Sequence, residues 1–271
     1  MSTSQIYPFN PVDWPAGPHD FTGDNNLGIY VDDSTQRYVP GTRLTTWDGR
    51  VFKYSGSKGA LLSGFGAFND STAVNISVTA ATIVAGQRTI PLAFASGDGY
   101  AGDGVCADKE LVGGYYVTGH GVSTVQNRLI IDTDGVGVSG TGGTITLYLD
   151  GPISNALTTP FTEVVLNPYR YLTRNSGGEY QSVMGVPAAN RTSTYWGWIQ
   201  SWGPCWVTPG GADSVPGNSA EDRTVVFVGD GSVNGVTAIT LENGYQVAGF
   251  IIDETANGTG ALPLVMLQIS I

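Results

Sequence analysis

Hydrophobic and polar positions alternate with a period of two over much of the chain after residue 72. Short segments place isoleucine, leucine or valine on one face with threonine between them, at Val74 to Val78, Ile90 to Phe94, Leu129 to Ile131 and Ile145 to Leu149. Glycine-rich turns separate these segments at intervals of roughly 10 to 15 residues, which suits antiparallel sheets and leaves no room for helical crossovers. The pattern predicts an all-β protein of antiparallel sandwich or barrel domains.

The chain is expected to divide into four parts, beginning with an extended Pro-rich N-terminal arm over residues 1–42. That arm holds five prolines and no periodic segment, so it cannot bury much of itself. We expect it either to be a disordered terminus or to lie along another surface, such as that of another subunit, through four apolar side chains: Tyr7, Phe9, Trp14 and Phe21. The remaining parts are a β-hairpin over 43–62, an inserted β domain over 63–155 and a C-terminal β domain over 156–271.

The hairpin is predicted from an Asp48-Gly49 pair between two runs of strand-forming residues. This arrangement is typical of a two-residue type I′ loop. Just after it, residues 58–68 are the one segment predicted to form a short helix, which Gly64 and Gly66 limit to two turns. The boundary between the inserted and C-terminal domains is placed at residues 151–160, a polar stretch bracketed by prolines.

The segment Tyr195 to Trp206 contains four of the six tryptophans. If it forms a regular strand, Gln200 shares one face with three of them: Trp196, Trp198 and Trp202. Such a row either seals the core of the C-terminal domain or faces a subunit interface or a sugar. These three tryptophans are our candidate interface residues in this part of the chain.

Composition excludes several classes of partner. Charged residues make up 13% of the chain, and 12 basic against 23 acidic residues give a net charge of −11. Without a basic cluster there is no surface to follow a phosphate backbone or an anionic membrane, so neither nucleic acid nor membrane is an expected partner. The N-terminus has no signal-peptide pattern and no apolar run reaches a bilayer-spanning length, which predicts synthesis in the cytoplasm.

We expect no catalytic residue, cofactor or metal ion. His19 and His120 are the two histidines, and neither lies in a nucleophile or zinc motif. Acidic turns at 98–104 and 132–135 are similar to calcium loops but lack the twelve-residue pattern, so ordinary turns are the favoured interpretation. A glycosidase with paired carboxylates stays open as an alternative. Cys106 and Cys205 form either one long-range disulfide or, as we prefer, two free thiols.

In residues 43–271 the chain resembles the decoration, or cement, proteins of tailed bacteriophages, which are structural virion proteins. The segments that carry the resemblance, in order, are Asp48 to Tyr54, Gly113 to Val117, Val164 to Tyr169, Gly185 to Pro187, Tyr195 to Pro204, Val247 to Phe250 and Val265 to Ile271.

The resemblance implies a non-catalytic protein that binds the outer surface of the capsid and stabilises it. Its partners would be the major capsid protein and itself, commonly as a homotrimer, and its location the virion after synthesis in the host cytoplasm. Two further alternatives are a tail-fibre, receptor-binding or carbohydrate-binding β module, and a protein that itself forms a shell or a tail tube.

Overall fold

The computed structural model of the chain describes residues 12–13, 28–46, 48–70, 75–79, 82–95, 104–119, 125–134, 142–158, 161–175, 181–210, 216, 223–236, 245–253 and 262–270. These segments contain strands, turns and isolated bridges but no helix, which confirms the predicted all-β class. In particular, no helix suited to crossing a membrane occurs in the described segments.

The chain forms two compact units, the second inserted into the first: unit 1 comprises residues 1–70 and 169–271, and unit 2 comprises residues 71–168. The strands of unit 1 are β1 (Val12–Asp13), β2 (Arg43–Thr45), β3 (Val51–Gly56), β4 (Ala67–Asn69), β13 (Leu172–Thr173), β14 (Val183–Pro187), β15 (Trp196–Trp206), β16 (Thr224–Phe227), β17 (Val233–Gly235), β18 (Val247–Asp253) and β19 (Leu264–Gln268). Those of unit 2 are β5 (Asn75–Thr79), β6 (Thr82–Ile83), β7 (Thr89–Phe94), β8 (Tyr115–Gly119), β9 (Gln126–Asp134), β10 (Gly143–Leu149), β11 (Leu157–Thr158) and β12 (Phe161–Val165).

The insertion therefore differs at both ends from the predicted bounds of 63–155. Strand β4 pairs with β13 and β14, so residues 67–69 belong to unit 1. Strand β12 lies between β5 and β8, so the predicted boundary at 151–160 falls inside unit 2. A proline-bracketed stretch in this case connects two strands of one unit, and strand pairing sets the boundary.

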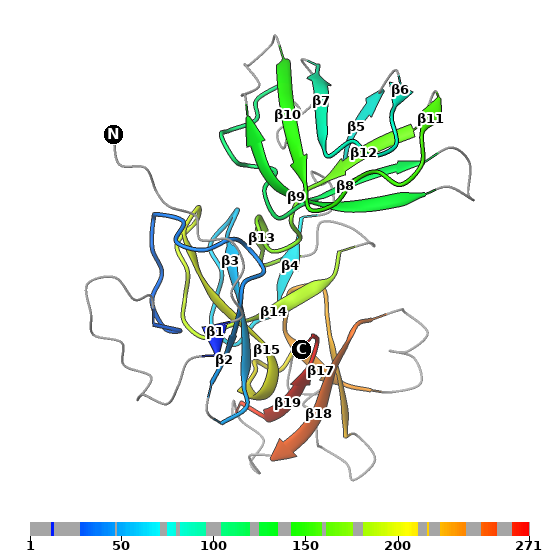
Figure 1. Cartoon of the computed structure of the whole chain (residues 1–271). Helices are drawn as coiled ribbons and strands as arrows, with labels where there is room; N and C mark the ends of the chain where they lie inside the picture. The colour runs from blue at the N-terminus through cyan, green and yellow to red at the C-terminus, as the bar shows by residue number, and fades with distance from the viewer. Residues whose placement is uncertain are drawn as a thin grey trace. The chain divides into compact units, whose positions relative to one another are not determined.

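Unit 1 is built on one sheet in the order β1-β2-β3-β15-β19-β18-β16-β17, with β14 and β4 joined to it through β15 (Figure 1). β15, with eleven residues, is the longest strand of the described chain. Its first half pairs with β3 and its second half with β19, both antiparallel. β15 therefore links the N-terminal hairpin to the C-terminal strands.

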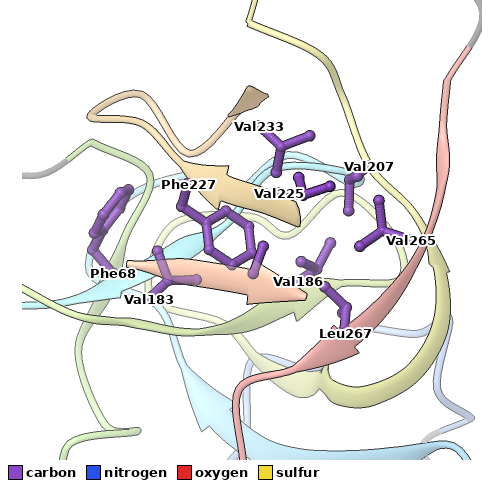
Figure 2. Close-up of a cluster of buried hydrophobic side chains, with 10 residues drawn as sticks. Phe68, Val183, Val186, Val207, Val225, Phe227, Val233, Val265 and Leu267 are labelled. Atoms are coloured by element: carbon purple, nitrogen blue, oxygen red, sulfur yellow. The ribbon is translucent and has the colours of Figure 1, made fainter. Parts of the chain in front are cut away.

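The core on the β16–β19 side of unit 1 is almost entirely aliphatic (Figure 2). Val265 and Leu267 are fully buried at alternate positions of β19. They pack with two phenylalanines and further valines, namely Phe68, Val183, Val186, Val207, Val225, Phe227 and Val233. At about 25 cal/mol per Å² of apolar surface, burial on this scale is the main stabilisation of the unit.

Unit 2 has a six-stranded antiparallel sheet in the order β5-β12-β8-β9-β10-β7. Ile145 and Leu147 of β10 are fully buried opposite Ile90 and Leu92 of β7, as predicted. In β9 the buried and exposed positions are the reverse of those predicted. Ile130 is fully buried, whereas Ile131, which was expected on the buried face, is 49% exposed. Three apolar residues in a row leave the phase of that strand undefined until pairing sets it.

The predicted hairpin is present as β2 and β3, but its loop is longer than two residues. The N–H of Thr46 donates to the C=O of Arg50, and the N–H of Gly49 donates to the C=O of Thr46. Gly49 has a φ of +82° whereas Asp48 has no positive φ, so this is a three-residue loop ending on a left-handed glycine, not a type I′ turn.

Two other predictions in this region are corrected. Residues 58–68 form turns and the start of β4 instead of a helix, with Gly64 at a φ of +79°. The predicted arm over 1–42 is too long, because Ile29 and Val39 are buried and Asp33 pairs its backbone with Trp196. Residues 28–42 are therefore part of unit 1, as is β1, which pairs with β2.

Candidate interaction face

The tryptophan-rich strand predicted from the sequence is β15, and its two ends have different surroundings. At the N-terminal end, Trp198 is 4% exposed and packs against Tyr54 with ring centroids 5.3 Å apart in an edge-to-face arrangement. Trp196 stacks on the same Tyr54 at 6.0 Å, and the Arg170 guanidinium lies 5.5 Å from the Trp196 ring. Trp196 and Trp198 thus seal a core, the first of the two interpretations of the row.

Arg191 holds this aromatic cluster to the backbone. Its Nη1 donates to Ser55 Oγ at 2.7 Å and its Nη2 donates to the C=O of Trp198 at 2.9 Å, although the residue is only 4% exposed. Burial lowers the pKa of the guanidinium to about 10. Burial has the opposite effect on the Tyr54 hydroxyl, whose pKa it raises, because here the charged form is the deprotonated one. This hydroxyl accepts a hydrogen bond from the Arg37 N–H at 2.9 Å. Both groups have structural partners, so they hold the cluster together.

A β-bulge separates the two ends of β15. Gln200 lies opposite Phe52 of β3, but Trp202 lies opposite Val51, so Ser201 is the extra residue. A slip of one residue reverses the faces of a strand. Trp202 therefore does not share a face with Trp196, Trp198 and Gln200 as predicted from strict alternation.

Beyond the bulge, β15, β19 and β18 present an apolar row away from the core. Pro204 lies opposite Met266 in the ladder, and Met266 lies opposite Phe250. Leu264 and Trp206, opposite each other, are two residues further along on the same face. We call Pro204, Trp206, Phe250, Leu264 and Met266 the outer apolar face; Trp206 is 48% and Phe250 44% exposed.

The outer apolar face is the reverse side of a well-packed sheet. Between its residues lie Val265 and Leu267, both fully buried in the core, and Cys205, which packs against that core. Burial raises the pKa of the Cys205 thiol to about 12, so it is not a thiolate at neutral pH. The face consists of apolar side chains held on a rigid scaffold, an arrangement that can bind another apolar surface but offers no reactive group.

Sequence reasoning singled out Trp202 and missed all five residues of this face as candidates, Trp206 included. Trp206 was visible as part of the aromatic block, but its exposure depends on the bulge. Phe250 and Met266 come together only through the pairing of β18 with β19. The four candidates in the N-terminal arm, Tyr7, Phe9, Trp14 and Phe21, lie outside the described residues, as do His19 and His120.

Of the two acidic turns similar to calcium loops, Asp98 and Asp103 lie outside the described residues, whereas Asp132 and Asp134 have protein partners. Asp132 forms an ion pair with Lys109 at 2.5 Å, and Asp134 accepts a hydrogen bond from the Tyr148 hydroxyl at 2.5 Å. Within the described segments no three potential metal ligands gather. Cys106 and Cys205 are both free thiols, one in each unit.

Comparison of the chain with protein-family models, curated proteins and solved structures found no match.

Proposed function

We propose that this chain is a non-catalytic structural protein of a bacteriophage particle, which binds the outer surface of the capsid and stabilises it. The observation that carries the proposal is the outer apolar face of unit 1. Exposed apolar side chains that gather on one rigid sheet face are typical of a protein interface, whereas isolated ones are ordinary.

The composition of this face supports a protein partner. A tryptophan, a phenylalanine and a methionine are residue types enriched at interface centres, and none of its five members is charged. The net charge of −11 does not oppose docking there, because the energy would come from apolar burial. The proposed partners are the major capsid protein and further copies of this chain, as a homotrimer.

Repetition over a shell would strengthen a contact of this modest size. A symmetric oligomer bound to a symmetric lattice makes each later contact intramolecular, so avidity can exceed the affinity of one contact by about 10² to 10⁴. The Pro-rich N-terminal residues on either side of β1 would add a second contact for each copy, through Tyr7, Phe9, Trp14 and Phe21. The place of action would be the virion surface, after synthesis in the host cytoplasm.

The test is binding to expanded empty shells made from the major capsid protein of the same virus. We expect the wild-type chain to co-sediment with the shells and to raise their melting temperature. Phe250→Asp should weaken binding by about tenfold or more, because it puts a carboxylate in an apolar contact.

Phe161→Asp is the matched control, since Phe161 also lies on a strand and is 45% exposed, but in unit 2. It should bind shells as the wild type does. The proposal fails if the wild-type chain does not bind shells, if both variants bind equally well, or if the purified chain assembles into tubes or shells without the capsid protein.

A further inference from the structure

A pocket of about 490 Å³ opens on unit 1 beside the hairpin loop. Its walls come from six parts of the chain: Tyr30, the loop residues Asp48 and Arg50, Ser63, the end of β14, Gln200 and Pro204 to Trp206 of β15, and Leu264 of β19. This volume lies within the usual range of small-ligand sites, roughly 300 to 1,000 Å³.

Two aromatic side chains line the pocket without being packed into a core. Tyr30 is 54% exposed and Trp206 is 48% exposed. Covering an exposed aromatic ring with an apolar surface releases water from the ring and lowers the free energy. The electron-rich face of the ring also attracts polarised C–H groups. Pyranose rings present such C–H groups on one face.

The polar groups of the pocket are held in place before any ligand binds. Arg50 Nε donates to Asp48 Oδ2 at 2.8 Å, and Asp48 Oδ1 accepts from the Thr46 hydroxyl at 2.5 Å. Gln200 is 3% exposed, and its Nε2 donates to the C=O of Pro204 at 2.8 Å and of Trp202 at 3.2 Å. The Gln200 amide thereby fixes the backbone of the pocket wall, while the held guanidinium can donate to, and the held carboxylate accept from, neighbouring hydroxyl groups at no further ordering cost.

The charges favour a neutral ligand over an anion. The Arg50 charge is balanced by Asp48 within the same loop, so a phosphate or carboxylate would meet an acceptor of its own sign. The chain as a whole is strongly acidic, with a net charge of −11, which further disfavours anions. An uncharged molecule with one apolar face and several hydroxyl groups fits both sets of side chains.

We propose that the pocket formed by Tyr30, Asp48, Arg50, Gln200 and Trp206 binds an uncharged saccharide. One sugar ring stacks on the exposed aromatic side chains while its hydroxyl groups bond to the Arg50–Asp48 pair. Pro204, Trp206 and Leu264 line the pocket and also belong to the outer apolar face, so a chain docked through that face cannot hold a saccharide at the same time. The inference does not rest on the proposed function, and the free chain is the form that would bind.

The experiment uses the purified full-length chain and an array of neutral and acidic glycans, followed by titration of the best neutral oligosaccharide with tryptophan fluorescence. We expect binding to a subset of neutral glycans, with a change in fluorescence. Tyr30→Ala should weaken that binding by about two- to tenfold through loss of stacking. Tyr30→Phe should keep most of it, because the ring remains.

Tyr115→Ala is the matched control, because Tyr115 is 39% exposed and lies on β8 of unit 2. It should bind as the wild type does, and circular dichroism should show that all three variants stay folded. The proposal is overturned if no neutral glycan binds at millimolar concentration, if acidic glycans alone bind, or if Tyr30→Ala and Tyr115→Ala behave alike.

Discussion

At the scale of single residues, several glycines are required by the close approach of neighbouring backbone. The clearest is Gly249 of β18, which has a φ of +149° and faces the adjacent strand β19. A Cβ placed there would lie 1.8 Å from the C=O oxygen of Met266. The outer apolar face therefore depends on this glycine, since Gly249 lies next to Phe250 and lets β18 and β19 pair closely.

Three glycine-to-alanine variants separate backbone strain from steric overlap. Gly249→Ala combines both and should lower the free energy of unfolding by about 3 to 5 kcal/mol. Gly49 has a φ of +82°, but an added Cβ would have open space around it. Gly49→Ala should therefore lower the free energy of unfolding by about 1 to 2 kcal/mol. Gly59→Ala has neither problem and should stay within about 0.5 kcal/mol of the wild type.

Urea denaturation followed by fluorescence gives all three values. Equal losses for Gly249→Ala and Gly49→Ala would contradict the close approach of β18 to β19.

At the scale of elements, β15 shows how one strand serves two purposes. Its N-terminal half packs Trp198 among Tyr38 and Tyr54, while its C-terminal half leaves Trp206 exposed on the opposite side of the bulge. The bulge at Ser201 makes this change of face within one continuous strand. A binding surface that projects from such a strand is rigid, which lowers the entropy cost of docking.

Two substitutions of the same residue type in β15 test this division. Trp198→Ala removes a side chain that is 4% exposed and should cost about 3 to 5 kcal/mol of stability. Trp206→Ala removes one that is 48% exposed and should cost less than about 1 kcal/mol while weakening shell and saccharide binding. Thermal unfolding and the two binding assays give the comparison, and a loss of stability at Trp206 equal to that at Trp198 would refute it.

At the scale of the whole molecule, unit 2 is inserted between two segments of unit 1, β4 and β13, that lie side by side. Asn69 of β4 lies opposite Leu172 of β13, so the two ends of the insertion are joined by strand pairing in unit 1. Each unit has its own buried core, with Val265 and Leu267 in unit 1 and Ile145 and Leu147 in unit 2. Two cores of this kind indicate two folding units.

We expect unit 1 to fold when residues 71–168 are replaced by a short Gly/Ser linker. Its free energy of unfolding should stay within about 1 kcal/mol of its value in the full chain, since the linker closes ends that already lie close together. All six tryptophans lie outside residues 71–168, so tryptophan fluorescence reports on unit 1 alone. Residues 71–168 expressed separately should give a β-sheet circular dichroism spectrum, and an unfolded spectrum for either piece would show that the units need each other.

The sequence by itself determined the all-β class, the alternation in β7 and β10, and the presence of a hairpin near Asp48 and Gly49. These are local properties, because alternation with a period of two and turn-forming residues act over a few positions. The same local signals misplaced the domain boundary, the loop type and the phase of Leu129 to Ile131.

Only the tertiary structure decided which tryptophans are buried and where an interaction face exists. One extra residue at Ser201 moved Trp202 to the other side of β15, and nothing in the sequence marks a bulge at that position. Phe250, Met266 and Trp206 are far apart in the chain and form one face only because β18, β19 and β15 pair in a particular register. Register depends on long-range packing of the whole unit, which is why it must be read from the folded chain.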